Sequence, residues 1–130
     1  QLSLALAHQT AGHPAQAIAI YEDILIAQPN SANIKNNLAL LFATTPMAEI
    51  RDGQKALKLA REVIAQAGEN HPSPLDSLGT ALAETGDFEG AIIATRKAIA
   101  AARTIGRNDL FQKLQSKIAL YQNGKPYHSE

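Results

Sequence analysis

Four histidines are the first residues in this chain that could carry metal or acid–base chemistry: His8, His13, His71 and His128. His8 and His13 are five positions apart, a spacing that does not place both side chains on one face of a helix. His71 falls in a predicted loop and His128 in a predicted frayed tail, and neither has a visible partner in the sequence. We therefore interpret the histidines as packed or surface residues, and we expect no metal site.

The carboxylates near the centre of the chain could in principle form an acid–base pair: Asp76, Glu84, Asp87 and Glu89. Asp87 and Glu89, however, stand at a predicted helix start, where the helix dipole favours negative charge. The sequence holds no nucleophile elbow, phosphate-cradling glycine loop or metal triad, and it has no cysteine. We expect neither enzymatic activity nor a cofactor.

Basic residues cluster only weakly. Lys55 and Lys58 are about one helical turn apart, but Glu62 follows at the next turn, which is typical of a solvated helix face. The formal net charge is zero. The aromatic residues Tyr21, Phe42, Phe88 and Phe111 are expected to face the core, which leaves none of them for base stacking. Nucleic-acid binding is therefore a weak third hypothesis, and no apolar run is long enough for direct membrane insertion.

Length and composition fit one folded domain. The chain has 130 residues, of which 45% are hydrophobic. Residues 1–48 carry only three charged side chains, Glu22, Asp23 and Lys35. We expect that this end is covered by more protein, so that the chain is a fragment of a longer one. It is interpreted as a soluble domain, with cytoplasm and periplasm both left open.

A short pattern recurs along the chain and predicts the elements that position these residues. Leu78–Gly79 precedes Ala91 by twelve residues with Gly86 between them, and Leu4–Ala5 precedes Ala17 in the same way, with Gly12 between them. The middle copy, Leu38–Ala39 and Ala56, has about five extra residues in its turn. Leu4 and Leu38 are 34 residues apart, a period that is typical of helical repeats.

Helix packing explains this pattern. Apolar residues at helical spacing predict two amphipathic helices in each copy. Where two antiparallel helices cross closely, small residues must face each other, as we expect for Gly79 and Ala91. Gly12 and Gly86 can adopt the positive φ that ends a helix, and Asp87 can cap the next one. Each copy is therefore a predicted helical hairpin.

The chain resembles the tetratricopeptide repeat (TPR) family over roughly residues 1–103, and its C-terminal half is similar to the last repeats of large bacterial members. The resemblance rests on these residues: Leu4, Ala5, Gly12, Ala17, Tyr21, Pro29, Leu38, Ala39, Phe42, Ala56, Leu78, Gly79, Leu82, Gly86, Phe88, Ala91 and Ala98. It implies an all-α, right-handed TPR-type solenoid with three helix-turn-helix repeats, at about 1–30, 31–68 and 72–104. The stretches TTPMAEIRDG and GENHPSP depart from the family pattern.

The segment after the third repeat is interpreted as a capping helix at about 107–122, followed by a tail at 123–130. Phe111, Leu114, Ile118 and Tyr121 have helical spacing, with Asn108 as a candidate cap. Such a helix seals the open end of a solenoid.

The resemblance implies a noncatalytic protein-protein interaction module that binds an extended peptide or partner segment on its concave face. The alternative is a structural tether or oligomerisation module of a larger bacterial protein, with self-association through the N-terminal edge. A monomer with an open groove would favour the first hypothesis, and a dimer that buries the groove would favour the second.

The first helix of each repeat is expected to line the groove. In the second repeat the groove residues are Asn33, Asn36, Asn37, Leu40 and Thr44. In the third they are Ser73, Ser77, Thr80 and Glu84, with Asp76 at the margin, and in the first Ser3, Leu6 and Thr10. This surface is predicted to be polar and nearly uncharged.

The resemblance further implies that the Asn37 amide holds the backbone of an extended, neutral or mildly basic peptide, with an apolar contact at Leu40. The places where related receptors carry cations for a terminal carboxylate hold Leu2, Leu6, Ser73 and Ser77 here, so no carboxylate clamp is expected. The alternative is that Asn36 and Asn37 merely tolerate solvent near a helix start.

Overall fold

A computed structural model describes residues 2–129, apart from the side chains of Leu2, Ser3, Gln9 and Thr10. The expected roles of Leu2, Ser3 and Thr10 in the groove therefore lie outside the described residues. Within the described range the chain is all-α, as predicted, with no strand. The helices are α1 (Leu2–Thr10), α2 (Pro14–Ala27), α3 (Ala32–Thr44), α4 (Gly53–Ala67), α5 (Pro72–Glu84), α6 (Phe88–Thr104), the short 3-10 helix η1 (Asn108–Leu110) and α7 (Phe111–Gln122).

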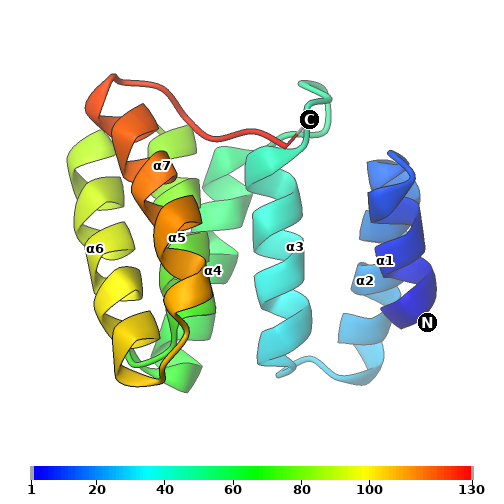
Figure 1. Cartoon of the computed structure of the whole chain (residues 1–130). Coiled ribbons are helices and arrows are strands. Elements are labelled where there is room, and N and C mark those ends of the chain that lie inside the picture. Colours follow the sequence, from blue (N-terminus) through cyan, green and yellow to red (C-terminus); the bar gives the residue numbers. More distant parts are fainter. Residues whose placement is uncertain (1, 130) are drawn as a thin grey trace.

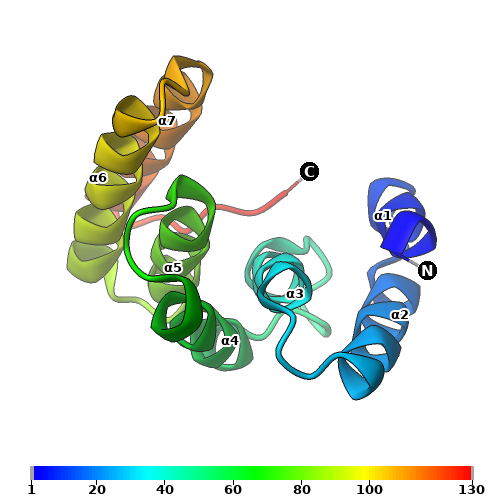
Figure 2. The same cartoon turned by 90° about the horizontal axis from the view of Figure 1, so that it is seen from below.

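Helices that are neighbours in the sequence are also neighbours in space (Figure 1). Helix α1 packs on α2, α3 on α4, and α5 on α6, while α7 packs on α6. Helix α3 also packs on α5. Figure 2 shows that the helices follow an arc, with α1 and α7 near its two ends and the C-terminal segment on its inner side.

The helix ends follow from local chemistry. Gly12 and Gly86 have φ of 81° and 93°, which confirms the prediction that they adopt positive φ between paired helices. The Asp87 carboxylate accepts a hydrogen bond from the Gly90 N–H and caps α6, also as predicted. The prediction that Asn108 caps the last helix is wrong. Asn108 begins η1, and α7 starts only at Phe111, without a side-chain cap.

The long connection between α3 and α4 is held by hydrogen bonds to backbone carbonyls in the last turn of α3 and just after it. The Asp52 N–H donates to the Phe42 carbonyl, and the Arg51 guanidinium donates to the Thr45 carbonyl. Asp52 then caps α4 by accepting from the Lys55 N–H. The extra residues therefore form an ordered loop that places Met47 and Arg51 next to the end of α3.

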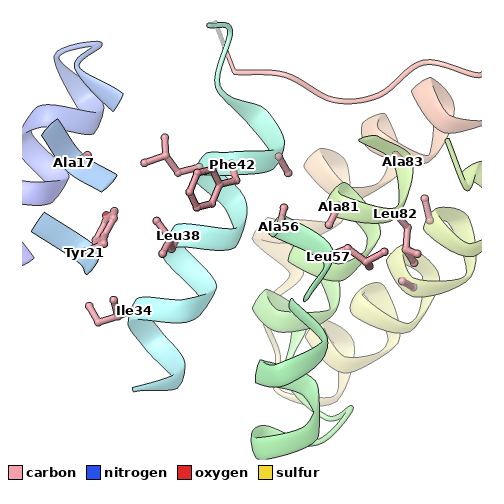
Figure 3. Packing of buried hydrophobic residues seen from close by; sticks show 14 of the residues in the cluster. Ala17, Tyr21, Ile34, Leu38, Phe42, Ala56, Leu57, Ala81, Leu82 and Ala83 are labelled. Atoms are coloured by element: carbon pink, nitrogen blue, oxygen red, sulfur yellow. The ribbon is translucent and has the colours of Figure 1, made fainter. Parts of the chain in front are cut away.

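The core runs between the helix pairs. Tyr21 of α2 points toward Leu38 of α3, and the same apolar layer continues through Ala56 of α4 (Figure 3). A second cluster joins Leu75 of α5 to Leu114 of α7 and to Ala98 and Ala101 of α6. Helix α7 therefore covers apolar surface of the last helix pair.

Helices α5 and α6 cross closely at Gly79. A Cβ atom placed on Gly79 would lie 3.1 Å from the Ala91 carbonyl oxygen and 2.7 Å from Thr95 Oγ1. Ala91 itself is fully buried. The predicted small-residue contact is thus present, and it sets how closely the two helices approach.

Candidate functional site

One hollow near the predicted groove residues is a cleft between the first helix pair and α3, which we call the α1–α3 cleft. It encloses about 450 Å³. Its lining residues are Leu6, Gly12, Pro14, Asn37, Leu40, Leu41, Thr45, Pro46, Met47 and Ser129. None of these side chains carries a charge. Helix α1 supplies Leu6, α3 supplies Asn37 and Leu40, and the ordered loop supplies Met47.

Asn37 is the polar group most available for a ligand in this cleft. It is half-buried, and its amide has no hydrogen-bond partner among the described residues. A primary amide can both donate to a carbonyl and accept from an N–H, which is the pairing that a peptide backbone offers. Leu40, one turn further along α3, is also half-buried and provides apolar contact beside it.

Asn33 and Asn36 belong to a different hollow. It lies between the starts of α3 and α5, encloses about 310 Å³ and also contacts Ser73. Asn36 Nδ2 donates to Ser73 Oγ at 2.9 Å, while Asn36 Oδ1 is buried with no partner among the described residues. Asn33 is exposed at the rim. The structure thus separates these two asparagines from Asn37.

The residues of α5 that were predicted to line the groove do not form an open polar stripe, which corrects the sequence prediction. Ser77 and Thr80 are fully buried. Ser77 Oγ donates to the Ser73 carbonyl, and Thr80 Oγ1 accepts from Lys117 Nζ at 3.2 Å. The prediction is wrong because side chains of α7 cover this face of α5.

Asp76 also has its partner on α7. Its carboxylate accepts a hydrogen bond from Lys117 Nζ at 2.9 Å, and the Lys117 side chain is only 2% exposed. Burial lowers the pKa of Lys117, although the Asp76 charge opposes that shift. Asp76 and Lys117 therefore form a buried ion pair that holds α7 on α5.

Thr44 and Glu84 lie together on the inner side of the arc, but their side chains already have partners within the protein. The Thr44 hydroxyl donates to the Leu40 carbonyl, and its side chain is buried. Glu84 Oε1 lies 2.7 Å from Arg51 Nε, and Glu84 Oε2 lies 2.9 Å from His128 Nε2. The predictions of a frayed His128 and a nearly uncharged surface are therefore wrong, because the tail and the α3–α4 loop bring charges to this place.

The residues that sequence reasoning missed are those that arrive from distant segments. Met47 and Arg51 come from the extra loop, and Lys117, Tyr127 and Ser129 from the C-terminal part. One signal for Lys117 was available, because it lies between Leu114 and Tyr121 at spacings of three and four residues, on the same helical face. The tail contacts had no comparable signal.

Tyr121 lies beside this ion pair, and we expect its ionisation to cause a measurable loss of stability at alkaline pH. Burial raises the pKa of Tyr121 from 10.0 to about 12. Because the folded state holds this proton more tightly than the unfolded state, the stabilisation is complete below pH 10 and is lost as pH rises toward 12. Between pH 9 and pH 11 we expect wild type to lose about 1.3 kcal/mol more than Tyr121→Phe does.

Urea unfolding of both proteins at the two pH values measures this difference. The lowered pKa of Lys117 has the opposite effect on the pH dependence of stability. Because Lys117 is present in both proteins, its contribution cancels from the difference between them. Equal losses in wild type and Tyr121→Phe would show that Tyr121 does not titrate in this way.

The other candidate chemistry does not assemble into a site. His8 and His13 lie edge to face with ring centroids 6.0 Å apart, because the turn at Gly12 folds them together. The described residues contain no group of three or more His, Cys, Asp or Glu that could hold a metal ion. No helix within residues 2–129 is both long and apolar enough to cross a membrane.

Comparison with known proteins assigns no family: no family model matches the chain, and no curated protein matches it. The α1–α3 cleft and its surroundings are therefore the features that bear on its function.

Proposed function

We propose that this chain is a TPR-type right-handed solenoid that acts as a noncatalytic binding module for an extended peptide, held in the α1–α3 cleft. The successive helix pairs and their arc support the solenoid. So does the burial of the small residues Ala5, Ala17, Ala39 and Ala56 at the predicted helix crossings. An arc of this kind places the first helix of each pair on the inner side, where a ligand can contact several repeats.

The observation that carries the proposal is the amide of Asn37, which lines the cleft and has no hydrogen-bond partner among the described residues. Ligand pockets are typically lined by apolar side chains with a few well-placed polar groups that fix the orientation of the ligand. Leu6, Leu40 and Met47 provide the apolar contacts here. The described residues of the lining carry no charge, which favours an uncharged ligand segment over an acidic terminus.

Substitution of Asn37 tests this assignment. A peptide array selects ligands for the wild-type chain, and fluorescence anisotropy then measures their affinity. We expect Asn37→Ala to weaken binding by roughly tenfold, since one hydrogen bond contributes about 1 kcal/mol and burying its unpaired partner costs more. Asn70→Ala, at an exposed asparagine in the α4–α5 connection, should bind like wild type. Selection of acidic C-terminal peptides, or unchanged binding by Asn37→Ala, would contradict the proposal.

A second candidate function, self-association as a structural tether, has one observation in its favour. Leu4 and Leu6 of α1 are 54% and 46% exposed at the end of the arc. Leu6 also lines the α1–α3 cleft, and helix positions two residues apart do not share a face, so Leu4 is the candidate contact at this edge. If this edge associates, light scattering over a dilution series should show a dimer that Leu4→Gln weakens. A wild-type monomer at all concentrations would exclude this function for residues 2–129.

A further inference from the structure

The C-terminal segment crosses the inner side of the arc rather than leaving the molecule (Figures 1 and 2). After α7, residues 125–129 have no regular secondary structure and run from α7 toward the end of α3. The Ser129 N–H donates to the Thr44 carbonyl at 2.7 Å, and Ser129 Oγ donates to the same oxygen at 2.9 Å. The segment is therefore fastened at its far end as well as at α7.

Three consecutive residues make contacts of different chemistry. Lys117 Nζ lies over the Tyr127 ring, 4.4 Å from the ring centroid, and the ring also packs against the apolar core. His128 Nε2 lies 2.9 Å from the Glu84 carboxylate. Ser129 supplies the hydrogen-bond donors. The order along the chain is thus an aromatic ring, a basic group and a hydroxyl.

The groups that receive this segment are held in place by other parts of the protein. Glu84 is fixed by Arg51, at 2.7 Å, and Lys117 is fixed by Asp76, at 2.9 Å. The Thr44 carbonyl belongs to the last residue of α3, where helix carbonyls lack a partner within the helix. All three groups would remain available if the tail were to leave.

This receiving surface continues into the α1–α3 cleft, because Ser129 is one of the residues that line the cleft. We infer that Thr44, Glu84 and Lys117 form an interaction surface for an extended partner segment with an aromatic, a basic and a hydroxyl residue in succession, and that Tyr127–Ser129 is the intramolecular occupant which such a partner displaces. The inference rests on the proposed function, since the partner segment would continue from this surface into the cleft.

The length of the connection sets the strength of the competition. Only four residues separate α7 from Tyr127. A short tether gives its attached segment an effective concentration on the order of millimolar, so a free segment with the same sequence competes poorly in the wild-type chain. Releasing the tail should therefore strengthen binding in trans.

The test uses the full chain and a labelled peptide with the sequence of residues 123–129. In the released variant, Tyr127→Ala, His128→Ala and Ser129→Pro remove the three anchors, and circular dichroism verifies its helix content. By anisotropy we expect the released variant to bind the peptide at least roughly tenfold more tightly than wild type. Glu84→Gln in the released variant should weaken this binding. Lys125→Ala, an exposed tail residue, should behave like wild type.

The outcomes separate this inference from the proposed function. No binding by a folded released variant, or binding no tighter than that of wild type, overturns the inference. If array-selected peptides still bind in an Asn37-dependent manner, only the role of the tail is refuted. If those peptides also fail to bind, both proposals are refuted.

Discussion

Replacing Asp76 with alanine should cost about 3 kcal/mol of unfolding free energy, because it leaves the buried ammonium of Lys117 without its counter-charge. The Lys117 side chain is only 2% exposed, so little solvent reaches its ammonium group. The remaining neighbours, the Thr80 hydroxyl and the Tyr127 ring, offer an acceptor and a π-face but no negative charge. Chemical denaturation followed by circular dichroism measures the loss.

Two controls separate the buried charge from ion pairing in general. Glu69→Ala breaks the pair with Lys97, whose side chains are 56% and 52% exposed, and it should change stability by less than about 0.5 kcal/mol. Lys117→Met combined with Asp76→Ala removes both charges and should recover much of the loss. A loss below about 1 kcal/mol for Asp76→Ala alone would show that Lys117 is solvated without Asp76.

Ala91→Leu is expected to destabilise the chain by about 1 to 3 kcal/mol, because it inserts a large side chain where α5 and α6 cross closely. Ala91 is fully buried, and its carbonyl oxygen is already near the backbone of Gly79. The helices must separate to accept the leucine, which also loosens the contact around Thr95.

The matched control for this substitution is Ala100→Leu, at an exposed position on the same helix. Because leucine and alanine are both good helix formers, the control should stay within about 0.5 kcal/mol of wild type. Thermal unfolding of the three proteins gives the comparison. If Ala91→Leu melts like wild type, the close crossing does not contribute to the stability of the helix pair.

The helix pairs were predictable because their signals are local. The positive φ of Gly12 and Gly86 and the cap at Asp87 depend on residues only a few positions apart. The contact of Gly79 with Ala91 follows from packing within one hairpin. The last helix was predicted with its buried face slightly misplaced. Its fully buried residues are Leu114, Lys117 and Tyr121, whereas Phe111 and Ile118 are only half-buried.

The candidate site was predicted only where one helix determines it. Asn37 and Leu40 follow from the face of α3 that the first helix pair leaves open, and both line the α1–α3 cleft. Thr80 was misplaced because its burial depends on α7, whose contacts come from 37 and 41 residues away. The contact of Ser129 with Thr44 spans 85 residues, and no local pattern in the sequence encodes it.

One methionine offers the most direct test that a peptide occupies the α1–α3 cleft. Met47 is the only methionine in the sequence, its side chain is 39% exposed, and it lines the cleft. Labelling its methyl group with carbon-13 therefore gives one NMR signal from the proposed site, apart from any initiator methionine. On titration with an array-selected peptide, this signal should shift with the same Kd as the anisotropy measurement, and Asn37→Ala should raise that Kd. Saturable binding of the peptide with no change at the Met47 methyl would contradict the account.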